Sequence, residues 1–277
     1  MSSGAVGPST GAIVLRDLSV CYSETGAGQL IVLVHGLAQD HRSWAPQFAA
    51  LQRHHVLAYD VRGHGGTDVG NPSGSLEQLG DDLIALLEWS GPAAVVGFSL
   101  GGTIALWAAA QRPDLVTEVV AVATSSVVGR SAASWYRERV QLVDEGRLEE
   151  LAAAIVEDTR AQIVRDDVDV QAIARDRVEA VGSGAGYRNA AVAMSHLRET
   201  PLTPRLADVS QPVTVVYGTA DVFCPRKAAE IMVAALPDAE LQAIEGAGHL
   251  INVDAPDRLT NAIVGRSLAE FHSREER

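Results

Sequence analysis

The stretch Gly97-Phe98-Ser99-Leu100-Gly101 decides the fold of this chain, because it joins two segments of different character. A short apolar run at 93–96 precedes it, and an apolar, helix-forming run at 102–110 follows it. This order predicts a strand, a sharp turn and a helix, with glycines where strand and helix pass close together. The turn would hold Ser99 in a strained conformation beside the first amides of the helix, which stabilise negative charge. Ser99 is therefore the candidate nucleophile, although the pattern alone also fits an ordinary glycine-rich turn.

Strand and helix patterns alternate on both sides of this turn. The expected strands are 13–17 and 18–22, which form a hairpin, then 29–34, 55–59, 93–96, 116–123, 213–218 and 240–244. The expected helices are 44–52, 76–89, 102–110, 225–236 and 256–271. Such alternation predicts the α/β class, with a mainly parallel central sheet covered by helices on both faces.

The segment 131–200 interrupts this alternation. It has no strand pattern, but four helical patterns at 135–143, 147–164, 170–181 and 187–197, the last two separated by a glycine-rich break at 182–186. We interpret it as an inserted helical lid (cap) at 126–205, between two parts of one core at 1–125 and 206–277. A four-helix interaction module is the alternative interpretation.

Composition narrows the functional classes. The 22 basic and 35 acidic residues give a net charge of −13, which disfavours nucleic acid and anionic membranes as partners. Cys21 and Cys224 have neither paired nor metal-site spacing, so we expect no disulfide framework and no metal. Residues 1–11 resemble a loose leader and not a signal peptide, and no apolar run approaches the roughly 18 residues of a spanning helix. We expect a cytoplasmic protein without a cofactor; a homo-oligomer is compatible with the sequence.

A serine nucleophile needs a base and a group that orients the base. Asp221 follows the strand at 213–218 and His249 follows the strand at 240–244, so both should lie with Ser99 outside the carboxyl ends of the parallel strands. The other histidines precede the serine or lie in the lid or the tail. Asp208 and Asp238 each precede a strand and cannot reach this edge. The predicted triad is Ser99, Asp221 and His249, in the chain order Ser, Asp, His.

Two further loops should reach the same edge. The strand at 29–34 ends in His35-Gly36-Leu37, where Gly36 permits a tight turn. We expect the His35 side chain to be structural, and the backbone amides of Leu37 and Leu100 to form an oxyanion hole. Asp60 and Arg62, in the loop after the strand at 55–59, would serve either an anionic substrate or loop architecture, and we favour architecture.

Five motifs in order resemble the α/β-hydrolase superfamily over nearly the whole chain outside the lid. They are His35-Gly36, Asp60-Val61-Arg62-Gly63-His64-Gly65, Gly97-Phe98-Ser99-Leu100-Gly101-Gly102, Gly218-Thr219-Ala220-Asp221 and Gly246-Ala247-Gly248-His249. Within it the chain looks most like small bacterial enol-lactonases, carboxylesterases and cofactor-free haloperoxidase-like esterases. Haloalkane dehalogenases and epoxide hydrolases carry Asp in place of Ser99 and are disfavoured. The short loop at Leu37 disfavours lipases with a longer glycine run.

The resemblance implies a serine hydrolase that cleaves a carboxylic ester or lactone of a small to medium substrate through an acyl-enzyme on Ser99. The same triad also serves carbon–carbon bond hydrolysis, thioester release or cyclisation in other proteins of this fold, and a non-catalytic ligand receptor is the least favoured alternative. The candidate substrate-binding residues are Trp44, Phe98, Trp135, Tyr136, Met194, Leu197, Phe223 and Leu250.

Overall fold

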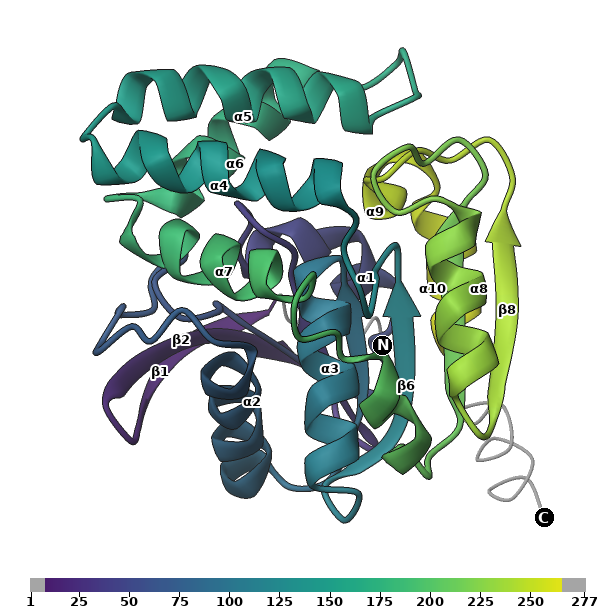
Figure 1. Cartoon of the computed structure of the whole chain (residues 1–277). Helices are drawn as coiled ribbons and strands as arrows, with labels where there is room; N and C mark the ends of the chain where they lie inside the picture. Colours follow the sequence, from purple (N-terminus) through teal and green to yellow (C-terminus); the bar gives the residue numbers. More distant parts are fainter. Residues whose placement is uncertain (1–7, 266–277) are drawn as a thin grey trace, which may run out of the picture.

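The structure, a computed structural model that describes residues 8–265, contains one sheet of eight strands (Figure 1). The strands are β1 (Ser9–Leu15), β2 (Leu18–Thr25), β3 (Leu30–Val34), β4 (His55–Tyr59), β5 (Ala93–Phe98), β6 (Val116–Val122), β7 (Val213–Gly218) and β8 (Ala239–Ile244). Their order across the sheet is β1-β2-β4-β3-β5-β6-β7-β8. The pairs β1/β2 and β2/β4 are antiparallel, and all pairs from β4 to β8 are parallel. The predicted α/β class and mainly parallel sheet are confirmed.

The chain changes direction across the sheet at β3. This strand lies between β4 and β5, so the loops that leave β3 and β5 diverge. Ligands of open α/β sheets bind in the crevice at such a point, outside the carboxyl ends of the strands. The topology therefore places the segments after Val34 and after Phe98 side by side at the edge where a site is expected.

Helices cover both faces of the sheet, because the strand residues alternate between two apolar clusters. Along β3, Val32 and Val34 belong to the cluster that includes α2 (Leu76–Ser90), α3 (Leu100–Gln111) and α8 (Arg226–Ala235). Ile31 and Leu33 belong to the cluster that includes α1 (Ala45–Ala50) and α10 (Pro256–Val264). Side chains of successive strand residues point to opposite faces, and each face needs its own cover.

Four helices are inserted between β6 and β7, as predicted. They are α4 (Arg130–Asp144), α5 (Leu148–Gln162), α6 (Val170–Val181) and α7 (Ala185–His196), and they form the upper layer in Figure 1. An apolar cluster joins Leu151, Ile155, Val181 and Tyr187 of these helices to Ala38, in the loop after β3. The inserted helices are thus anchored to the sheet edge; the division at residues 126 and 205 stays a prediction.

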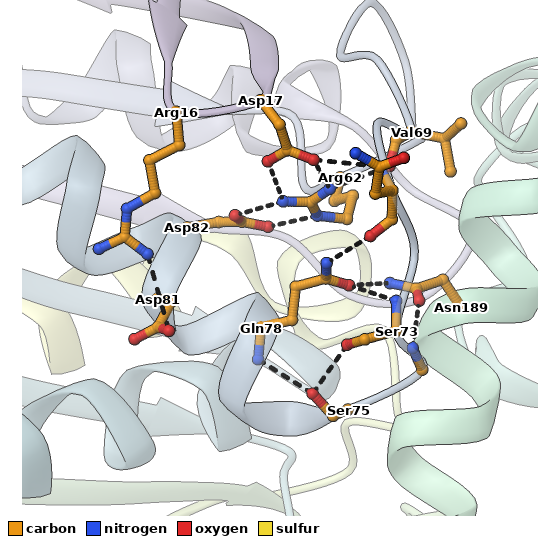
Figure 2. Close-up of polar contacts among 12 residues, drawn as sticks. Arg16, Asp17, Arg62, Val69, Ser73, Ser75, Gln78, Asp81, Asp82 and Asn189 are labelled. Carbon is orange, nitrogen blue, oxygen red and sulfur yellow. Dashed lines mark hydrogen bonds and ion pairs between the residues drawn. The ribbon is translucent and has the colours of Figure 1, made fainter.

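Helix α7 also reaches down beside α2. The Asn189 side-chain oxygen accepts a hydrogen bond from the Gly74 amide at 2.6 Å, next to Ser75, which caps α2 (Figure 2). Met194 and Leu197, at the end of α7, belong to the same buried cluster as α2 and α3. The end of α7 therefore contributes to the apolar core on the face of the sheet that α2 and α3 cover.

Some boundaries differ from those predicted. Residues 9–11 are paired with β2 in β1 and are not a loose leader. The predicted helix at 44–52 is a 3₁₀ turn, His41–Trp44, followed by α1, and a second 3₁₀ segment, Thr203–Asp208, follows α7. A short helix α9 (Ile251–Asp254) precedes α10, and the part of the predicted last helix at 266–271 lies outside the described residues. Among residues 8–265, no helix combines the length and apolar character needed to cross a membrane.

Candidate active site

Ser99 occupies the turn between β5 and α3 with a φ of 50° and a ψ of −115°. A residue other than glycine at positive φ costs about 1–3 kcal/mol and persists only where its surroundings hold it. Here the Ser99 amide donates to the Val122 carbonyl at 2.8 Å, and the Thr124 hydroxyl donates to the Ser99 carbonyl at 2.6 Å. A Cβ on Gly101 would lie 2.2 Å from the Val34 carbonyl oxygen, so only glycine allows α3 to begin this close to β3. The predicted sharp turn is thus present.

The structure brings the three predicted triad residues together. Ser99 Oγ lies 3.1 Å from His249 Nε2, and His249 Nδ1 lies 2.8 Å from Asp221 Oδ2. The other Asp221 oxygen accepts hydrogen bonds from the amides of Phe223 and Cys224 at 2.7 and 2.9 Å. An ionised Asp221 fixed in this way accepts the Nδ1 proton of His249, which leaves the Nε2 lone pair directed at the Ser99 hydroxyl.

Two aromatic rings flank the imidazole of His249. The ring centroids of Phe98 and Phe223 lie 5.2 and 5.4 Å from that of His249. Asp221 is 4% exposed and His249 is 5% exposed, so the pair is almost closed off from solvent. A hydrogen bond in such surroundings is electrostatically stronger than one in water, which favours a single orientation of the imidazole.

The two amides predicted to form the oxyanion hole belong to Leu37, in the loop after β3, and Leu100, at the start of α3 after the neighbouring strand β5. Leu37 follows β3, and the turn continues through Ala38, which has a φ of 57°. Among the hydrogen bonds of residues 8–265, none uses the Leu37 amide as donor. Leu100 is the first residue of α3, where an amide has no acceptor within its own helix. Both amides are therefore able to donate to an anion beside Ser99, and their role stays a prediction.

A cavity of about 420 Å³ opens onto Ser99 and His249, between the sheet edge and the inserted helices. Its other lining residues are Leu37, Ala38, Phe98, Gly129, Ser131, Ala132, Trp135, Tyr136, Ile155, Asp158, Gln162, Arg177, Tyr187, Val222, Phe223 and Cys224. Four of the predicted wall residues, Phe98, Trp135, Tyr136 and Phe223, are among them. This volume is within the range of small-molecule sites, about 300–1,000 Å³.

The other four predicted wall residues do not line the cavity. Trp44 and Leu250 are buried in the cluster with α1 and α10, at 1% and 0% exposure. Met194 and Leu197 pack in the cluster with α2 and α3, because the end of α7 reaches past the sheet edge. For these residues the prediction of a substrate contact is wrong, and they are core residues.

The sequence patterns did not identify four polar residues of the inserted helices that line the cavity. Asp158 and Gln162 of α5, Arg177 of α6 and Tyr187 of α7 all line the cavity. A signal for Arg177 did exist, since it falls on the stripe of buried residues in α6 that includes Ala174 and Ala180. A charged residue at helical spacing among small apolar ones is buried with its helix face, and it needs partners there.

Arg62, Asp60 and His35 are structural, as favoured from the sequence. The Arg62 guanidinium donates to Asp82 at 2.8 and 2.7 Å and to Asp17 at 3.0 Å, which joins the loop to α2 and to the β1–β2 turn (Figure 2). Asp60 accepts from the amides of His41 and Gly66. His35 Nε2 accepts from the Val61 amide at 2.9 Å, and burial lowers the pKa of this histidine. None of the three lines the cavity.

Among residues 8–265, Cys21, His41 and Asp60 place three potential metal-ligand atoms within 4.8 Å of one another. His41 Nδ1 and Asp60 Oδ1 are already hydrogen-bonded to each other at 2.8 Å. Burial raises the pKa of Cys21 to about 11, so its thiol is protonated at neutral pH. A metal ion at this group would have to displace both this hydrogen bond and the thiol proton.

Comparison with known proteins places this geometry in a family. A 3-oxoadipate enol-lactonase from Acinetobacter baylyi is 28% identical over 258 residues, which cover 91% of this chain and 94% of that protein. The crystal structure of a hydrolase from Pseudomonas aeruginosa superimposes with a TM-score of 0.81 at 26% identity, over 95% of this chain and 98% of that one. An enol-lactonase from Burkholderia xenovorans has the same fold, with a TM-score of 0.82 at 24% identity over 92% and 98% of the two chains. The profile described as the alpha/beta hydrolase fold matches residues 29–256, and the chain belongs to this family.

Proposed function

We propose that this protein is a serine hydrolase that cleaves a carboxylic ester or lactone of small to medium size through an acyl-enzyme on Ser99. The observation that carries the proposal is the unbroken series of hydrogen bonds from Ser99 through His249 to Asp221, at 3.1 and 2.8 Å, facing a cavity. A nucleophile, a base and an orienting group within hydrogen-bond reach are the requirement for nucleophilic catalysis.

In the first step, His249 Nε2 takes the proton of Ser99 as Oγ attacks the carbonyl carbon. Negative charge develops on the carbonyl oxygen, and the amides of Leu37 and Leu100 stabilise it. Asp221 stabilises the imidazolium and holds its tautomer. His249 then protonates the leaving alkoxide, and the carbon–oxygen bond breaks to leave the acyl group on Ser99.

In the second step, His249 deprotonates a water molecule, which attacks the acyl-enzyme. The Ser99 oxygen leaves with the proton from His249, and the carboxylic acid is released. With a lactone, the alcohol stays attached to the acyl group, so hydrolysis gives a single hydroxy acid. The sequence similarity to an enol-lactonase over 91% of the chain supports the inclusion of lactones.

The test is hydrolysis of a panel of p-nitrophenyl esters, lactones and thioesters by the wild type and by Ser99→Ala. We expect turnover of esters or lactones, and a loss on the order of 10⁶-fold in kcat in the variant. Ser183→Ala, at an exposed serine before α7, serves as the matched control. Turnover of thioesters alone would favour the thioester chemistry, and a Ser99→Ala variant with near wild-type turnover would remove Ser99 from the reaction.

A further inference from the structure

A buried arginine faces the candidate active site from the inserted helices. Arg177 of α6 is 8% exposed and lines the same cavity as Ser99. It also lines a second cavity of about 350 Å³, toward Arg42 and Asn252. A charged side chain in this position is costly to bury unless a partner compensates the charge.

The partners of the guanidinium within the protein are all neutral. Its Nη1 donates to Gln162 Oε1 at 2.7 Å and to Thr159 Oγ1 at 2.9 Å. Its Nε donates to the Ala38 carbonyl at 3.3 Å, and Nη2 donates to the Leu37 carbonyl at 3.4 Å. These contacts use four of the five N–H groups of an arginine and leave one on Nη2.

No carboxylate within residues 8–265 pairs with this guanidinium at 4.0 Å or less. The acidic residue that lines the same cavity is Asp158, which is ion-paired with Arg139 at 3.1 Å. Burial lowers the pKa of Arg177 to about 10, so the side chain is still charged at neutral pH. Asp158 acts on Arg177 only through its charge and not as a contact partner, so this guanidinium has no carboxylate in direct contact, in a chain whose net charge is −13.

We propose that Arg177 binds a carboxylate on the acyl portion of the substrate, so that this hydrolase selects anionic esters or lactones over neutral ones. The inference rests on the function proposed above. A carboxylate supplies a counter-charge in direct contact and accepts a hydrogen bond from the remaining Nη2 N–H group, and arginine is suited to such recognition in a desolvated site.

The position of Arg177 also limits the length of the substrate. Its Nη2 contacts the carbonyl of Leu37, the residue whose amide is expected to hold the oxyanion. The carboxylate and the reacting carbonyl should therefore be joined by a short chain, as in half-esters of succinate, glutarate or adipate.

The experiment compares charged and neutral esters of equal length. The substrates are p-nitrophenyl hydrogen glutarate and p-nitrophenyl methyl glutarate, with the succinate and adipate pairs alongside. We expect the wild type to prefer the charged ester in kcat/KM. Arg177→Met should lower this preference by about tenfold or more, because a hydrogen bond to a charged group contributes at least this much. Arg177→Lys should retain part of it.

Arg175→Met is the matched control, since Arg175 is an exposed arginine on the same helix and its loss changes the net charge equally. It should keep the wild-type preference. A wild type that hydrolyses both esters equally well overturns the proposal, even if Arg177→Met does not fold. An Arg177→Met variant that loses the same factor on both esters also overturns it, and assigns Arg177 to positioning the Leu37–Ala38 loop alone.

A binding measurement separates this inference from the proposed function. Calorimetry measures the binding of glutarate to Ser99→Ala and to Ser99→Ala/Arg177→Met, and it requires no turnover. Weaker binding by at least about tenfold in the double variant supports the carboxylate site even if none of the esters is hydrolysed. Equal binding, or none to either, contradicts the site.

Discussion

Replacement of Asp221 by asparagine perturbs the proposed relay with little change in shape. The asparagine oxygen can still accept hydrogen bonds from the amides of Phe223 and Cys224, which in the wild type lie 2.7 and 2.9 Å from Asp221 Oδ1. Its NH2 group then takes the place of Asp221 Oδ2, which in the wild type lies 2.8 Å from His249 Nδ1. Because an amide N–H donates, Nδ1 must become the acceptor, and the His249 proton moves to Nε2. The imidazole would present N–H to Ser99 and could not take its proton.

The expected loss is on the order of 10⁴-fold in kcat, as for the wrong tautomer in other serine triads, or about 5 kcal/mol in the activation barrier. The assay is the hydrolysis of p-nitrophenyl acetate by the wild type and by Asp221→Asn, with urea unfolding to verify that the variant is folded. Asp208→Asn is the control, because Asp208 is an exposed acid just before β7. A folded Asp221→Asn enzyme within about tenfold of the wild-type kcat would refute the role of Asp221 as the orienting group.

Three further substitutions test the description of the core and of the cavity. Met194→Ala should lower the free energy of unfolding by about 2–5 kcal/mol with little effect on KM, because Met194 is a core residue; a large change in KM at unchanged stability would contradict this. Phe223→Ala should change KM with little effect on the free energy of unfolding, since Phe223 lines the cavity beside His249. Burial lowers the pKa of His64 from 6.5 to about 4. The neutral side chain therefore contributes its full stabilisation above pH 6.5. This contribution to the free energy of unfolding, about 3 kcal/mol, is lost as the pH falls toward 4. In urea unfolding from pH 7 to pH 4, His64→Asn should lose correspondingly less stability than the wild type, and parallel curves would show that His64 does not titrate in this way.

The sheet and the three residues at its edge were predictable because each depends on local sequence. Largely apolar segments of four to eight residues predicted the strands, and the loops that follow β5, β7 and β8 lie at one edge of the sheet irrespective of how the helices pack. The glycines around Ser99 carry the same information, since Gly101 lies against the Val34 carbonyl and tolerates no side chain there. The convergence of Ser99, Asp221 and His249 therefore follows from strand order and turn chemistry.

The walls of the cavity were less predictable, because periodicity does not say which element a helix face packs against. Met194 and Leu197 have the helical spacing of a buried face, and only the course of α7 beside α2 shows that this face belongs to the core. The place of Arg177 on the small-residue stripe of α6 indicates burial, but its contact partners depend on how α6 packs on the Leu37–Ala38 loop. Such packing involves residues about 140 positions apart, and local propensity carries no information on it.

The central claim is that Ser99 is the activated nucleophile of this cavity, and covalent labelling tests it most directly. The wild-type protein is treated with a fluorophosphonate probe, digested, and analysed by mass spectrometry to locate the adduct. We predict a single adduct on Ser99, and loss of labelling in His249→Ala because the base is removed. An adduct on a different serine, or labelling of Ser99 that is equally fast without His249, would contradict the account.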